Sequence, residues 1–122
     1  VMEQLDIAES EIIALDSHLT ANLVSDFDFT ELLRSLHNAK GTIGMVGSSD
    51  LNGGGTRLLH VVETGIEMIC QGSIESSPAL IDKFLFSISV CKDSLHGRDI
   101  ETVSLKLVEL FSRLFVHLAM MI

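Results

Sequence analysis

The sequence contains one proline, no tryptophan, no tyrosine and only six phenylalanines in 122 residues. β-Sandwiches and β-barrels need many turn residues and many aromatic strand residues, so this composition argues against both. The two cysteines, Cys70 and Cys91, lie in apolar segments and form no CxxC pair. We expect them to be buried, reduced thiols, and a disulfide is the alternative that their Cα separation decides. The hydrophobic content of 47% and the length indicate one folded domain rather than a disordered tail.

Basic side chains are also few: eight Lys and Arg oppose 17 Asp and Glu, and the net charge is −9. An acidic surface repels phosphate backbones and anionic lipids, so nucleic acid and membrane are not the expected partners. A membrane-spanning helix needs about 20 apolar residues, and the most apolar stretch, 103–122, is interrupted by Lys106, Glu109, Arg113 and His117. No segment has the pattern of a signal peptide, so we expect a cytoplasmic protein. Because the chain does not begin with methionine, we expect it to be a piece of a longer one.

Apolar residues recur at helical spacing in five segments. We predict helices over Met2–Val24, from a cap at Asp28 to about residue 46, from Leu51 or Thr56 to Gln71, from Pro78 to about His96, and from Asp99 to the end. The expected core stripe of the first helix is Leu5, Ile12, Leu15, Leu19 and Leu23. Short loops between such helices predict an all-α fold. The expected architecture is an antiparallel up-down four-helix bundle over about residues 2–97, with an additional C-terminal helix over about 99–122.

The second predicted helix holds the most informative group of residues. Leu33 and Leu36 lie on its apolar stripe, so His37 points away from the core. Lys40 and Gly41 follow three and four residues later, on the same side of the helix. A helical glycine leaves space for close approach, and a lysine supplies positive charge for a phosphate. A neutral imidazole is a competent nucleophile near neutral pH, so this trio indicates phosphoryl chemistry.

The segment His37-Asn38-Ala39-Lys40-Gly41 resembles the H-x-x-K-G signature of histidine phosphotransfer (HPt) domains. The pair in His60-Val61-Val62-Glu63 resembles the H-x-x-E of the N-terminal phosphotransfer domain of CheA-type histidine kinases. With the acidic first helix, the resemblance covers roughly residues 3–96 and implies one HPt domain over 1–122. The interval from His37 to His60 is about four residues longer than in the family, close to one helical turn. The glycines at 53–55 lie in that excess, either in an added turn or in a longer loop.

The resemblance implies that His37 is phosphorylated on Nε2 while Glu63 accepts a hydrogen bond from Nδ1–H. Lys40 would neutralise phosphoryl charge, Gly41 would leave room for the partner's active site, and His60 would complete a polar network with Glu63. The implied partners are an ATP-binding histidine kinase domain and the receiver domains of response regulators in a bacterial cytoplasm. The sequence has no phosphate-binding GxxxxGK[ST] loop, so the domain would be a phosphocarrier without its own nucleotide, cofactor or metal. Whether it is free-standing or part of a larger kinase stays open.

Two other functions compete with phosphotransfer. One is a metal site, although no two of the five histidines are three or four residues apart; they are His18, His37, His60, His96 and His117. The other is a helical interaction or dimerisation module that uses the apolar C-terminal helix and transfers no phosphate. Motifs of a serine, cysteine or paired-carboxylate enzyme are absent from the sequence.

Overall fold

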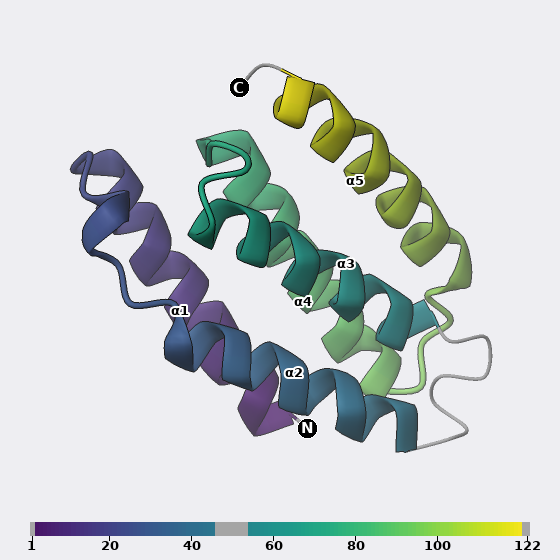
Figure 1. The fold of residues 1–122 in the computed structure, drawn as a ribbon. Helices are drawn as coiled ribbons and strands as arrows, with labels where there is room; N and C mark the ends of the chain where they lie inside the picture. Colours follow the sequence, from purple (N-terminus) through teal and green to yellow (C-terminus); the bar gives the residue numbers. More distant parts are fainter. Residues whose placement is uncertain (1, 46–53, 121–122) are drawn as a thin grey trace.

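The computed structural model describes residues 2–45 and 54–120, and these ranges contain five α-helices, one short 3-10 helix and no strand. The elements are α1 (Met2–Thr20), η1 (Val24–Asp26), α2 (Thr30–Met45), α3 (Gly54–Cys70), α4 (Pro78–Leu95) and α5 (Glu101–Met120) (Figure 1). The prediction of an all-helical fold is therefore confirmed.

Helices α1 to α4 share one hydrophobic core. α2 packs against α1 and α3, and α4 packs against the same two helices from the other side. α5 packs mainly on α3, with a smaller contact to α4, and lies on the far side of α3 from α1 and α2 (Figure 1). The largest fully buried side chains come from all five helices and include Leu5, Leu32, Leu58, Phe84 and Phe111.

The first helix ends earlier than its apolar pattern predicts. α1 stops at Thr20, because Asn22 adopts a left-handed backbone with φ of 59°, and the chain then forms η1. Asparagine is one of the few residues that tolerate this conformation at the end of a helix. The predicted end at Val24 is therefore wrong, and Leu23 is exposed rather than part of the core stripe.

The predicted start signals of α2 and α4 and the predicted stop signals of α3 and α4 are confirmed, whereas the predicted end of the second helix at about residue 46 lies outside the described residues. The Asp28 carboxylate accepts a hydrogen bond from the Thr30 N–H at the beginning of α2. The Ser77 hydroxyl accepts one from the backbone N–H three residues later and caps α4. Gly72 and Gly97 follow α3 and α4 with φ of +76° and +80°, a backbone conformation that favours glycine over other residues.

The third helix begins inside the glycine run, at Gly54, rather than at Thr56. The alternative start at Leu51 lies outside the described residues. Glycine is costly inside a helix, by about 1 kcal/mol, but here it serves close packing. The Ser104 hydroxyl of α5 donates a hydrogen bond to the Gly54 carbonyl over 2.7 Å, and a Cβ on Gly54 would lie 3.4 Å from that hydroxyl.

A second glycine, Gly65, receives α5 on the same side of α3. A Cβ at this position would lie 2.5 Å from the Phe115 ring and 3.0 Å from the Phe84 ring. Phe111 stacks on both Phe84 and Phe115, so three rings fill the space between α3, α4 and α5. α5 contains most of the apolar C-terminal stretch, yet none of the described helices is both long and apolar enough to span a bilayer.

Neither Cys70 nor Cys91 forms a disulfide. Cys91 is buried in α4, as predicted, and its thiol lies 3.9 Å from the Gly55 carbonyl. Cys70 is exposed, so the prediction that both thiols are buried is wrong for this residue. Cys70 is the last residue of α3, and the three residues that follow it are exposed as well.

Candidate functional site

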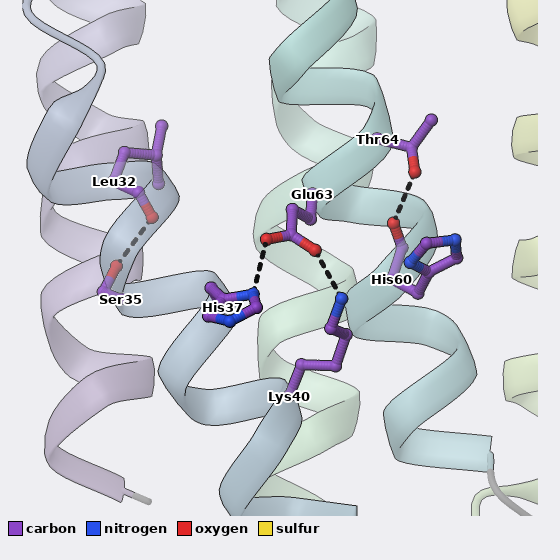
Figure 2. Close-up of polar contacts among 7 residues, drawn as sticks. All are labelled: Leu32, Ser35, His37, Lys40, His60, Glu63 and Thr64. Carbon is purple, nitrogen blue, oxygen red and sulfur yellow. Dashed lines mark hydrogen bonds and ion pairs between the residues drawn. The ribbon is translucent and has the colours of Figure 1, made fainter.

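Helix α2 places His37 on the surface. Leu32, Leu36 and Ala39 are fully buried on the opposite side of the helix, and the His37 side chain is 72% exposed. The predicted solvent-facing position is therefore confirmed. The nearby Ser35 is buried, and its hydroxyl is satisfied by a hydrogen bond that it donates to the Leu32 carbonyl (Figure 2).

A carboxylate from α3 joins two side chains of α2. Lys40 Nζ donates a hydrogen bond to Glu63 Oε1 over 2.7 Å, and His37 Nδ1 lies 3.5 Å from Glu63 Oε2 (Figure 2). The Glu63 side chain is only 9% exposed and that of Lys40 22%. A carboxylate with so little access to water needs a counter-charge, and the Lys40 ammonium provides it.

The geometry distinguishes the two ring nitrogens of His37. Nδ1 faces the carboxylate of Glu63, while the ring as a whole is mostly in solvent. A carboxylate beside Nδ1 favours the tautomer with the proton on that nitrogen, which leaves the lone pair on Nε2. The distance of 3.5 Å is longer than an ordinary hydrogen bond, so Glu63 acts on the ring mainly through its charge. The site can therefore present an oriented, exposed nucleophilic nitrogen.

The surface next to His37 is open at Gly41. A Cβ built on this glycine meets no atom of the described residues within 4 Å, so their packing does not require glycine there. Gly41 lies four residues after His37, on the same side of α2. The absence of a side chain at Gly41 therefore leaves space for a molecule that approaches His37 from solvent.

His60 lies one turn before Glu63 on α3 and is exposed. Its backbone carbonyl accepts a hydrogen bond from the Thr64 hydroxyl, but within the described residues its ring makes no hydrogen bond or ion pair with His37, Lys40 or Glu63. Figure 2 shows its ring directed away from the Glu63 carboxylate. The structure thus brings together His37, Lys40 and Glu63, with Gly41 alongside, and leaves His60 at the edge.

The hydrogen bond from Lys40 to Glu63 is not predicted from the sequence, where the family resemblance assigns Lys40 to the phosphoryl group. Nothing in the sequence signals it, because the two residues are 23 positions apart and the number of helical turns in the interval between them does not follow from the sequence. The described residues contain no group of three or more His, Cys, Asp or Glu placed to hold a metal ion. Comparisons with protein-family models, curated proteins and solved structures found no match to this chain.

Proposed function

We propose that this protein is a histidine phosphotransfer domain that carries a phosphoryl group on Nε2 of His37. The observation that carries the proposal is the contact of Glu63 with both His37 and Lys40, because it supplies orientation and charge at an exposed imidazole. The H-x-x-K-G resemblance of residues 37–41 supports the same function. We further infer an up-down order of α1 to α4, which agrees with the packing of each helix on its neighbours in the chain.

The chemical step is a substitution at phosphorus. The Nε2 lone pair of His37 forms a bond to phosphorus while the bond from phosphorus to the donor's oxygen breaks, and that oxygen leaves with the electron pair. The ring keeps its proton on Nδ1 and gains positive charge. The Glu63 carboxylate stabilises this charge, and the Lys40 ammonium, which is held by the other oxygen of the same carboxylate, would neutralise part of the phosphoryl charge. The reverse sequence returns the phosphoryl group to an acceptor carboxylate.

The proposed donors and acceptors are a histidine kinase domain with bound ATP and the receiver domains of response regulators, in the cytoplasm of a bacterium. The open surface at Gly41 supports this assignment, because a partner's reactive group must come within bonding distance of Nε2. The protein would act as a phosphocarrier in a two-component signalling relay, with the catalytic cofactors held by its partners.

The direct test uses phosphoramidate, a small phosphoryl donor whose leaving group is ammonia, so no partner protein is needed. We expect one phosphoryl adduct by intact-mass analysis, labile in acid, and its absence in His37→Gln. Because His37 is exposed, that variant should keep the helicity and melting temperature of the wild type. Wild type that acquires no adduct, or a variant that is labelled equally, would contradict the proposal.

A second candidate is a dimerisation module without phosphotransfer. It is favoured by α5, which carries five of the eight exposed large apolar side chains of the described residues: Val103, Leu105, Leu110, Val116 and Met120. Sedimentation equilibrium of the wild type and of Leu110→Lys tests it. A stable dimer that the substitution dissociates, together with no adduct on His37, would favour this function over phosphotransfer.

A further inference from the structure

One side of α5 presents apolar side chains to solvent along a straight stripe. Residues 105, 109, 112 and 116 are spaced four, three and four apart, so they lie along one side of the helix. Leu105 is 47% exposed and Val116 62% exposed, and Glu109 and Ser112 between them are exposed as well. The opposite side of the helix packs on α3 and α4. We call these four residues the α5 stripe.

The charge of the protein restricts which of its surfaces can meet a second copy. Each copy has a net charge of −9, so two copies repel each other. α1 contributes strongly to this repulsion, since it has five acidic side chains and neither Lys nor Arg. α5 has no net charge, because its two acidic and two basic side chains balance; they are Glu101, Glu109, Lys106 and Arg113. Because α5 also carries five of the eight exposed large apolar side chains of the described residues, a second copy meets little repulsion and the most apolar surface there.

The order of side chains along the α5 stripe suits an antiparallel pair of helices. When two α5 helices run in opposite directions about their common midpoint, Leu105 of one copy faces Val116 of the other, and symmetry forms this contact twice. Glu109 of one copy then faces Ser112 and the neighbouring Arg113 of the other. A parallel pair would instead place Glu109 against Glu109, and two like charges in contact are unfavourable.

Arg113 can serve both copies at once. Its guanidinium pairs with Glu109 of its own helix, and its five N–H donors allow it to hold a second carboxylate without releasing the first. Both side chains are mostly exposed, so their charges favour one orientation and add little affinity. Val103 and Leu110 lie on the other flank of α5, next to Lys106. Two copies that met on that flank would bring basic side chains together.

We propose that two copies of this protein associate through α5, antiparallel and along the α5 stripe. The inference goes beyond the proposed phosphotransfer function and does not depend on it. Within the described residues α2 makes no contact with α5 and lies on the other side of α3 (Figure 1). Association through α5 therefore leaves His37 of each copy accessible to a phosphoryl donor.

The size of the contact predicts a weak and reversible dimer. α5 has 20 residues and is about 30 Å long, and a contact between two helices is about 10 Å wide, so each copy buries on the order of 300 Å². Stable complexes bury about 1,200–2,000 Å² in total, so we expect a dissociation constant on the order of 100 µM. Added salt should strengthen the dimer, because it screens the repulsion between two acidic copies and leaves the apolar contact intact.

Sedimentation equilibrium from about 20 µM to about 1 mM protein tests the proposal. We expect a monomer–dimer equilibrium for the wild type, and Val116→Lys should weaken it by about tenfold or more, because the new ammonium meets Leu105 at both symmetric contacts. Two controls place the same lysine at an exposed apolar position outside the α5 stripe. They are Ile13→Lys on α1, at a residue 53% exposed, and Leu110→Lys on the other flank of α5, at a residue 43% exposed. Both controls should dimerise like the wild type.

Cross-linking reports the direction of the two helices. The exposed Cys70 is first replaced by serine, so that the buried Cys91 is the one native thiol left. The variants Leu105→Cys and Val116→Cys are then mixed and oxidised. An antiparallel pair predicts disulfides between the two different variants, which intact mass distinguishes from disulfides between identical ones.

The remaining outcomes would overturn the proposal. They are a monomer at every concentration, a dimer that Val116→Lys leaves intact, equal weakening by Leu110→Lys, or disulfides mainly between identical variants. Labelling of His37 by phosphoramidate is measured in parallel on Val116→Lys and should proceed at the wild-type rate, because α5 does not contact α2. Failure of labelling in the wild type refutes the phosphotransfer function, whereas failure to dimerise refutes only the inference about α5.

Discussion

Replacing Glu63 by glutamine tests whether its charge activates His37. Glutamine keeps the shape of the side chain and can still accept a hydrogen bond from Lys40 Nζ, which now lies 2.7 Å from Glu63 Oε1. What is lost is the negative charge 3.5 Å from His37 Nδ1. The variant therefore separates the electrostatic role of the residue from its packing.

The expected magnitude follows from these contacts. A hydrogen bond to a charged group is worth roughly 1.5–3 kcal/mol, and the long separation from Nδ1 indicates a value at or below the low end. A loss of about 1.4 kcal/mol in the transition state corresponds to a tenfold slower reaction. The free energy of unfolding should fall by less than about 1 kcal/mol, because Lys40 keeps an acceptor and can reach water.

The assay is the rate of His37 labelling by phosphoramidate, followed by intact mass, together with urea unfolding of the same variant. Glu67→Gln is the matched control, because Glu67 lies on the same helix but is exposed, and Glu63 is the carboxylate that faces His37 within the described part of the chain. We expect about tenfold slower labelling for Glu63→Gln and an unchanged rate for the control. Equal rates for wild type and Glu63→Gln would refute the role assigned to the carboxylate.

Three further predictions concern other parts of the molecule. Gly41→Ala should raise the free energy of unfolding by about 0.5–1 kcal/mol, because its Cβ meets no atom of the described residues. The same variant should slow phosphoryl transfer between His37 and a protein partner, but not labelling by phosphoramidate. A variant that is less stable than wild type in urea would contradict the first expectation. Gly65→Ala should lower the free energy of unfolding by about 1–3 kcal/mol, because the new Cβ would press on the Phe115 ring. Adding Phe115→Leu to this variant should restore part of the lost stability. Thermal unfolding that shows the two losses to be additive would contradict the packing argument. Lys92→Met should cost about 0.5–1 kcal/mol near neutral pH, because the hydrogen bond from its ammonium to Asp6, 2.6 Å away, raises the pKa of Lys92 above its ordinary value of 10.5. The contribution of this ion pair to the free energy of unfolding is present near neutral pH and is lost as pH rises above 10.5 through the raised pKa of Lys92 in the folded state. If Lys92→Met still lowers the stability at a pH above that pKa, the ion pair is not the source of the loss.

The local rules predicted most of the helices because their signals lie within a few residues of each other. The cap at Ser77 and the stop at Gly97 bound α4 as expected, since each acts on backbone groups of its own turn. The exposed position of His37 followed from the apolar stripe of its own helix. The apolar pattern did not predict the end of α1, because Asn22 adopts a left-handed backbone and turns the chain although apolar spacing continues to Leu23.

The sequence alone determined which helices form and that His37 faces solvent beside Lys40 and Gly41, since residues three and four apart on one helix are neighbours whatever surrounds them. Only the tertiary structure decided that Glu63 reaches Lys40 and His37 while His60 does not, and that Gly54 and Gly65 receive α5. The physical reason is that contacts between helices depend on their mutual register. That register is set by the packing of whole surfaces, such as the Phe84, Phe111 and Phe115 rings against α3, and not by the spacing of residues within one helix.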